Sequence, residues 1–183
     1  MKTTYQIDPA HSSAHFSVRH MMISNVRGGF KTVKGTVVYD PENPGASTVE
    51  AEIDATTIGT NDDQRDAHLR SADFLDTEKF PTIKFQSTHV EPSRDGEHKV
   101  EGNLTIHGVT RPVVLVVDGP TPEGKDPWGN MRTGASATTR IKRSDFGLSW
   151  NAALETGGLL VGDDLKIELD LQLIKASETS KTA

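Results

Sequence analysis

The sequence predicts an all-β protein in which about eight antiparallel strands form a closed up-and-down barrel around a cavity. The clearest observation is the segment from Leu165 to Leu173, where apolar and polar side chains alternate without a break. The same two-residue period recurs in most upstream segments, which turn-forming sequences connect. Strands with one apolar face bury it either between two stacked sheets or inside one closed sheet.

The size of the apolar side chains favours the closed sheet. Ala14, Ala51, Gly102, Ala135 and Ala137 fall on the apolar faces and contribute little volume, and aromatic residues make up only 5% of the chain. A barrel of about eight strands either fills its interior with side chains or holds one small ligand. We therefore expect a ligand-sized apolar cavity. The alternative is that the small residues allow two sheets to pack tightly.

Length and composition limit the class of protein. The 183 residues predict one domain over residues 1–175, followed by a polar tail over residues 176–183. The net charge of -6 argues against nucleic-acid binding, which needs a basic surface. The absence of cysteine excludes disulfides, thiolate zinc sites and cysteine nucleophiles, and it leaves the redox compartment open.

The sequence also lacks the apolar runs of exported or membrane-spanning proteins. Residues 1–13 contain no apolar run like the core of a secretory signal. Val113 to Val117 is one of the longest wholly apolar runs, far below the roughly 20 residues of a spanning helix. We expect a soluble, cytoplasmic protein without a transmembrane segment. A leader removed before residue 1 would leave no trace in this sequence.

The alternation of apolar and polar residues predicts the strands. In chain order they cover residues 5–8, 13–19, 26–39, 48–54, 83–89, 100–107, 113–118, 131–141 and 165–173. In the third, Phe30 lies out of phase with Val33 and Val37, which indicates a bulge or bend near Gly28-Gly29 or Gly35. In the fifth, Ile83 and Phe85 share a face that could extend to Ser87 and His89.

Residues Asn61 to Ser71 predict the one helix. Asn61 is a suitable N-cap with Gln64 three residues later, and Asp66 and Arg70 have the spacing of an ion pair. The expected surface partners of Arg65 and Arg70 are Asp62, Asp66 and Asp73.

Two long connections follow. Residues 119–130 are rich in proline and glycine and predict a loop. The segment from Arg140 to Asp164 has no clear period, and connections longer than roughly 12–15 residues are uncommon unless they act as lids or binding segments. Phe146, Leu148 and Trp150 make this segment apolar, so we expect it to cover the barrel mouth.

Six sequence blocks together resemble the YceI-like, polyisoprenoid-binding family. The blocks are DPAHSSAHFSVRH (8–20), VRGGF (26–30), RDAHLRSADFLD (65–76), FPTIKFQS (80–87), GNLTIHGVTRPV (102–113) and RSDFG (143–147). They follow the family order from about Tyr5 to Leu173, and a phenylalanine pair common in the family is Phe74-Leu75 here. The resemblance implies a lipocalin-like barrel with a helical interlude that holds a long isoprenoid or similar amphiphile. Exported relatives exist in this family.

The candidate ligand contacts are apolar residues of the predicted strands, the helix end and the second long connection. They are Phe16, Val18, Phe30, Phe74, Leu75, Phe80, Ile83, Phe85, Leu104, Ala135, Ala137, Phe146, Leu148 and Trp150. His20, Arg27 and His68 are candidates for contact with a polar or phosphorylated head group. For the two histidines, the alternative is a structural hydrogen bond.

The hydrocarbon tail of a bound lipid should contribute more to the binding free energy than its head group does. Each buried methylene contributes roughly 0.8 kcal/mol, whereas a net hydrogen bond adds about 1 kcal/mol. We therefore expect loose head-group specificity. Filling the cavity by Gly102→Leu or Ala137→Phe should lower lipid occupancy more than stability.

We expect no metal and no cofactor other than the bound polyisoprenoid or quinone-like lipid. His11 and His15 would share a face only in a fully extended segment, and Pro9 makes that geometry doubtful. The sequence contains no HExxH motif.

The predicted function is non-catalytic binding, carriage or storage of a long-chain isoprenoid lipid of the polyprenyl or isoprenoid-quinone type. One alternative is a fatty-acid-like amphiphile. Another is a lipid-modifying enzyme that uses His20, His68 or Asp66 as acid or base. The lack of a GxSxG motif, a P-loop and a dinucleotide fingerprint argues against the enzyme. The expected partner is a long-chain amphiphilic lipid, and the sequence leaves a homodimer and transient membrane contact open.

Overall fold

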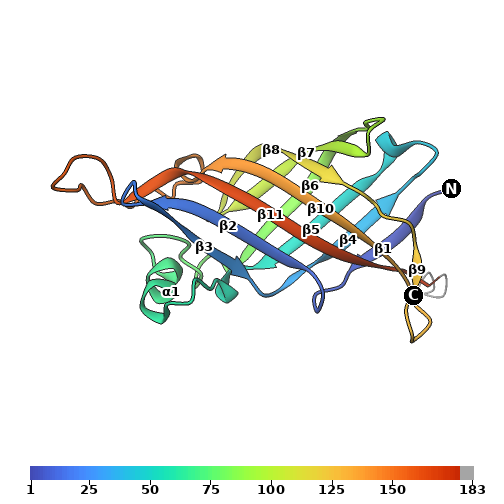
Figure 1. The fold of residues 1–183 in the computed structure, drawn as a ribbon, viewed down its shortest axis with the longest axis horizontal. Coiled ribbons are helices and arrows are strands. Elements are labelled where there is room, and N and C mark those ends of the chain that lie inside the picture. Colours follow the sequence, from blue (N-terminus) through green and yellow to red (C-terminus); the bar gives the residue numbers. More distant parts are fainter. Residues whose placement is uncertain (178–183) are drawn as a thin grey trace.

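The computed structural model describes residues 1–177 and shows an elongated, closed antiparallel β-barrel (Figure 1). The strands are β1 (Thr3–Ile7), β2 (Ser13–His20), β3 (Ser24–Phe30), β4 (Val33–Tyr39), β5 (Thr48–Asp54), β6 (Thr82–Glu91), β7 (Glu97–Ile106), β8 (Val109–Asp118), β9 (Gly124–Lys125), β10 (Met131–Lys142) and β11 (Val161–Lys175). Helix α1 covers Asp63–Arg70, and single 3₁₀ turns cover Pro44–Ala46, Ala55–Thr57 and Arg143–Phe146. Most of the predicted polar tail, residues 178–183, lies outside the described residues.

Pairing between β10 and β11 closes the barrel. The eight strands around the ring are β11, β1, β4, β5, β6, β7, β8 and β10, in that order. The β10–β11 register runs from Arg132 opposite Ile174 to Lys142 opposite Asp164. The prediction of a closed barrel, rather than two stacked sheets, is therefore confirmed.

The hairpin formed by β2 and β3 is added to this ring. The edge of β11 opposite β10 is shared, because residues 161–170 pair with β2 and residues 173–175 pair with β1. The predicted single strand over residues 26–39 is wrong, since β3 ends at Phe30 and β4 begins at Val33. The break at residues 31–32, and not a bulge at the glycines, lets Phe30 and Val33 both face the interior.

A bulge changes the inward face of β6. The register with β7 shifts between Ser87 and His89. His89 is consequently exposed, and Val90, only 6% exposed, takes the inward position beyond the bulge. The predicted inward face is correct for Ile83 and Phe85, but it does not extend to His89.

Helix α1 lies at one end of the barrel, beside β3 (Figure 1). Its N-cap is Asp62 and not Asn61, because the Asp62 carboxylate accepts a hydrogen bond from the Arg65 N–H at 3.0 Å. Asn61 precedes the cap with a φ of 61°. The buried Asp66 accepts hydrogen bonds from the Thr60 N–H and hydroxyl at 2.8 and 2.6 Å.

The expected surface ion pairs of the helix arginines do not form. Arg65 donates to the Thr60 hydroxyl at 2.7 Å, and the Arg70 guanidinium lies 3.5 Å from the Ile58 carbonyl. The side chains of both arginines therefore connect helix α1 to Ile58 and Thr60, which precede it in the chain.

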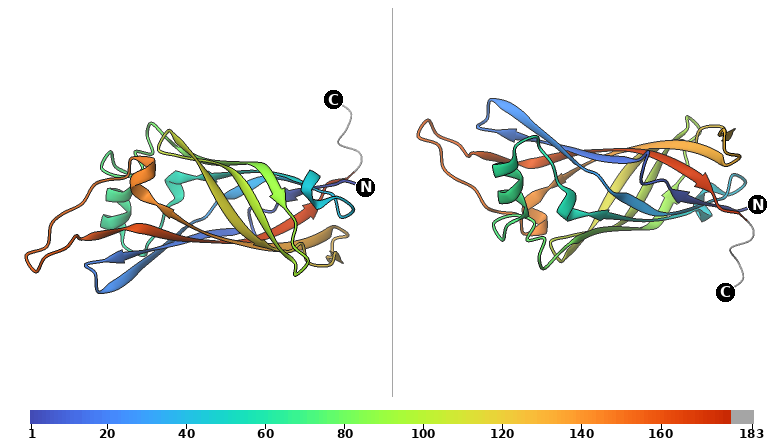
Figure 2. Two further views of the ribbon diagram at one scale, coloured as in Figure 1. Left: turned by 90° about the horizontal axis from the view of Figure 1, so that it is seen from above. Right: turned by 90° about the horizontal axis from the view of Figure 1, so that it is seen from below.

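The second long connection is shorter than expected, because β10 extends to Lys142 and β11 begins at Val161. Its first part covers the barrel end, with Phe146 and Leu148 buried. Residues 151–160 instead project beyond the barrel next to the β2–β3 hairpin (Figure 2). Residues 119–130 form the predicted loop, apart from β9, which pairs with Met131 and Arg132.

Gly102 has a role that its small size alone did not indicate. A Cβ atom at this position would overlap the Phe85 ring, meeting its Cζ and lying 2.6 Å from its Cε2, and it would lie 2.6 Å from the Gln86 carbonyl oxygen. The glycine therefore leaves room for the aromatic ring of the neighbouring strand, rather than for a ligand.

We accordingly expect Gly102→Leu to destabilise the protein by about 1–3 kcal/mol or more, through overpacking. Chemical denaturation measures this change. Gly124→Ala is a matched control, since a Cβ there meets no atom within 4 Å. Equal unfolding free energies for Gly102→Leu and the wild type would contradict the proposed contact.

Candidate functional site: an apolar cavity inside the barrel

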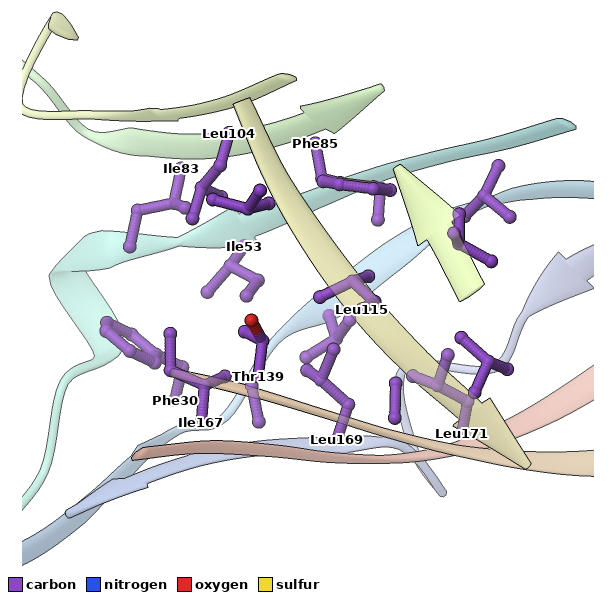
Figure 3. A pocket seen from close by; sticks show the side chains of 18 of the residues that line it. Phe30, Ile53, Ile83, Phe85, Leu104, Leu115, Thr139, Ile167, Leu169 and Leu171 are labelled. Atoms are coloured by element: carbon purple, nitrogen blue, oxygen red, sulfur yellow. The ribbon is translucent and has the colours of Figure 1, made fainter. Parts of the chain in front are cut away.

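The barrel encloses an apolar cavity of about 270 Å³. Side chains from β1, β2, β3, β4, β5, β6, β7, β8, β10 and β11 line it. Figure 3 shows ten of them converging on the same space: Phe30, Ile53, Ile83, Phe85, Leu104, Leu115, Thr139, Ile167, Leu169 and Leu171. Closure of the sheet directs alternate residues of each strand inward, so the cavity wall follows from the two-residue period.

Strand β11 runs along the whole cavity. Its lining residues are Val161, Leu165, Ile167, Leu169, Leu171 and Leu173. At roughly 3.4 Å per residue, the regular segment from Leu165 to Leu173 spans about 27 Å. The cavity is therefore long and narrow, and its longest wall is the most regular apolar segment of the sequence.

Eleven of the candidate ligand contacts line the cavity. They are Phe16, Val18, Phe30, Phe74, Leu75, Ile83, Phe85, Leu104, Ala135, Ala137 and Leu148. Their contact with a ligand remains a prediction, but the fold brings residues from β2, β3, β6, β7, β10 and the helix end to one space.

The other six candidates do not line the cavity. Phe80 packs edge-on against His107 with ring centroids 4.9 Å apart, and a Cβ on Gly108 would meet its ring. Phe146 is 1% exposed and belongs to the core near the barrel end. Arg27 is exposed on β3, and His20 is half-buried at the end of β2.

His68 and Trp150 belong to an aromatic cluster at the helix end. His68 Nε2 lies 2.8 Å from the Asp73 carboxylate, which is the structural hydrogen bond expected as the alternative role. The ring centroids of His68 lie 5.0 Å from Phe74 and 4.7 Å from Trp150. Of these side chains, only Phe74 reaches the cavity.

Several lining residues were not among the candidates. They include Tyr5, Ile7, Val33, Val37, Ala51, Ile53, Val113, Leu115, Val117 and, from β11, Val161, Leu165, Ile167, Leu169, Leu171 and Leu173. Most of them occupy the apolar positions of predicted strands, so alternation carries a signal for them. The inward position of a side chain, and not its aromatic character, decides which residues form the wall.

Arg143 connects the cavity wall to the second connection. Its side chain is 5% exposed and donates to the carbonyls of Leu148, Trp150, Val161 and Gly162 at 2.6–3.3 Å. Burial lowers the pKa of this guanidinium. Its hydrogen bonds hold the start of β11 and the segment after the 3₁₀ turn together.

The opposite end of the barrel is held by polar contacts of residues 119–130. The Tyr5 hydroxyl donates to Glu123 at 2.6 Å, and Lys175 lies 3.2 Å from the same carboxylate. Arg132 donates to Asp8 and Asp126 at 2.6 Å each. These bonds from Arg132 lower the pKa of both aspartates.

Neither a metal site nor a spanning helix is found in the described part of the chain. Residues 1–177 contain no group of three or more potential metal ligands. Over the same range, no helix combines the length and apolar character that a membrane crossing requires. His11 contacts Asp8 at 2.7 Å and His15 contacts Ser13 at 3.1 Å.

The closed antiparallel barrel and its long apolar cavity make this protein a lipocalin-like barrel. Comparison with known proteins identifies its family. The model of the YceI-like domain matches residues 5–173, so this chain belongs to the YceI-like family. Protein YceI of Escherichia coli O6:H1 is 42% identical over 146 residues, which cover 79% of this chain and 75% of that protein.

Solved structures share the fold. The YceI protein of Campylobacter jejuni is 28% identical and has a TM-score of 0.71, with 87% of this chain and 90% of that one aligned. A polyisoprenoid binding domain from Saccharophagus degradans has a TM-score of 0.67 at 15% identity, with 95% and 99% of the two chains aligned. The second likeness shows the fold alone.

The Tyr5 contact gives a testable pH dependence. Burial, together with the hydrogen bond to Glu123, raises the pKa of Tyr5 to about 12. In a Tyr39→Phe variant, which leaves Tyr5 as the only tyrosine, we expect tyrosinate absorbance to appear near pH 12.

The raised pKa of Tyr5 also makes the free energy of unfolding depend on pH. The native state keeps the proton at a pH where the unfolded chain, with a pKa of 10.0, loses it. This contribution is complete below pH 10 and disappears as the pH rises toward 12. The unfolding free energy of wild type should therefore fall over this range more than that of Tyr5→Phe. A Tyr5 ionisation near pH 10 would contradict the buried contact.

Proposed function

We propose that this protein binds and carries a long-chain isoprenoid lipid inside the barrel, without chemical change to the lipid. The single observation that supports this most is the long apolar cavity along β11. A long, narrow apolar space suits an extended hydrocarbon chain better than a compact ligand. The polyisoprenoid binding domain that shares the fold supports the same ligand class.

The polar groups at the two ends of the cavity argue for a neutral or outward-facing head group. Arg143 lines the cavity, but its donors are directed to four backbone carbonyls. Tyr5 donates to Glu123. A buried carboxylate needs a charged or hydrogen-bonding partner, so a polyprenol or isoprenoid quinone fits these ends better than a fatty-acid-like amphiphile.

The placement of the candidate acids and bases supports carriage over catalysis. His68 is paired with Asp73, and Asp66 is buried against Thr60. Neither these side chains nor His20 lines the cavity. A general acid or base must reach the reacting group, and these residues lie outside the wall that would hold the lipid.

The direct test is organic extraction of the purified protein followed by mass spectrometry. We expect an intact isoprenoid lipid at close to one molecule per chain, and no conversion of it by wild type, His20→Ala or His68→Ala. Turnover that disappears in a folded His68→Ala or His20→Ala variant would favour the enzyme. Recovery of fatty acids alone would favour the alternative ligand.

A cavity-filling substitution tests where the lipid lies. Ala137 is 4% exposed and points into the cavity from β10, whereas the next residue, Thr138, is exposed on the outer face. We expect Ala137→Phe to reduce lipid occupancy by at least about half. The unfolding free energy should change by less than about 2 kcal/mol, because the ring enters open space.

Thr138→Phe is the matched control and should retain full occupancy. Native mass spectrometry measures bound lipid, and chemical denaturation measures stability. Unchanged occupancy in a folded Ala137→Phe protein would place the lipid outside the cavity.

A further inference from the structure

The turn between β2 and β3 exposes three consecutive large apolar side chains. Met21, Met22 and Ile23 are 42%, 61% and 74% exposed. The turn lies at the end of the barrel where α1 is found (Figure 1). A few scattered apolar residues on a surface need no explanation, but adjacent ones at the extremity of an elongated protein indicate a contact site.

Two of these residues, Met21 and Met22, also adopt a strained backbone conformation. Met21 and Met22 have φ angles of 51° and 59°, and the Ile23 N–H donates to the His20 carbonyl at 3.1 Å. This is the geometry of a type I′ turn, which strongly favours asparagine and glycine. Methionine adopts this turn at an energetic cost. Asparagine and glycine would adopt it without strain and would expose no apolar side chain there.

A second loop completes the surface. The Met21 N–H donates to the Leu160 carbonyl at 2.7 Å, and a Cβ on Gly158 would meet the Met22 sulfur. Leu159 is 53% exposed in the same loop. Figure 2 shows the two loops extending together beyond the barrel. We call the group formed by Met21, Met22, Ile23 and Leu159 the apolar tip.

The apolar tip lies next to the cavity. Val161 follows the second loop, lines the cavity and pairs with His20, the residue that begins the turn. Val18, two residues before His20, also lines the cavity. A lipid that leaves the cavity at this end would emerge beside the tip.

The charge around the turn differs from that of the whole chain. The protein has a net charge of -6, yet residues 9–39 contain no aspartate or glutamate. Arg19 and Arg27 are exposed on the two strands of the hairpin. Glu155 is the one carboxylate in residues 151–162. Apolar side chains flanked by arginines suit the surface of an anionic bilayer.

We propose that the apolar tip docks on an anionic lipid bilayer, so that lipid passes between the membrane and the barrel at this end. The purpose of the docking rests on the proposed function, but the docking itself does not. A second copy is a poorer occupant, because a symmetric contact would bring Arg19 and Arg27 of both copies together. Four side chains also offer far less than the roughly 800 Å² per partner of a stable interface.

The test measures partitioning of the full chain onto vesicles of phosphatidylcholine mixed with phosphatidylglycerol. The variant Met21→Asn/Met22→Gly removes both methionines and gives the turn its preferred residues. We expect its partitioning to be weaker by about tenfold or more, because the variant loses two methionine side chains that would be buried in the bilayer. Its thermal midpoint should equal or exceed that of wild type, which excludes unfolding as the cause.

Trp128→Ser is the matched control. Trp128 is 81% exposed and precedes β10 in the loop at the opposite end of the barrel, so its loss should leave partitioning unchanged (Figure 1). Leu159→Ser should weaken partitioning through the second loop. Vesicles of phosphatidylcholine alone, or high salt, should also weaken it.

Three results would overturn the docking proposal. They are equal partitioning of the turn variant and wild type, a dependence of partitioning on Trp128 alone, and a wild-type dimer that is lost in the turn variant while vesicle binding persists.

Lipid occupancy in solution separates this proposal from the proposed function. Tip variants should keep their bound lipid and transfer it to vesicles more slowly. A protein that docks but never contains lipid would refute carriage and leave the docking site supported.

Discussion

The structure depends on the pairing of β11 with neighbours along both of its edges. On one edge it pairs with β10 over nearly its whole length, and on the other it pairs first with β2 and then with β1. This pairing turns an eleven-stranded sheet into a closed ring of eight strands, with the β2–β3 hairpin and the short strand β9 at its margins. Closure leaves each strand of the ring with one face that water cannot reach, and that face must be apolar.

The cavity is the consequence of closure with small inward residues. Alanines at positions 14, 51, 135 and 137 line the wall, so the interior is not filled by protein atoms. Polar groups near the ends are engaged in holding the structure, with Arg143 bound to backbone carbonyls and Tyr5 bound to Glu123. What remains for a ligand is a long apolar surface, on which affinity depends mainly on the length of hydrocarbon buried.

The accuracy of the sequence-based predictions varied with the range of the interactions involved. Alternation predicted the inward faces of β7, β10 and β11 correctly, because side-chain direction in a strand is a local property. It failed where a backbone irregularity changes the phase, as at the bulge before Val90 and at the break after Phe30. The prediction that Phe80 and Trp150 line the cavity is wrong, because these two side chains pack against the rings of His107 and His68 outside it.

From the sequence alone came the strand class, the closed-barrel preference, the single helix and the apolar character of the interior. All of these depend on residue type and on a period of two. Only the tertiary structure decided which contacts close the two ends of the barrel and which apolar residues lie outside its cavity. Tyr5 and Glu123 are 118 positions apart, and Met21 lies beside Leu160 only because β2 pairs with β11. Such partners are set by strand order and register, which no local pattern specifies.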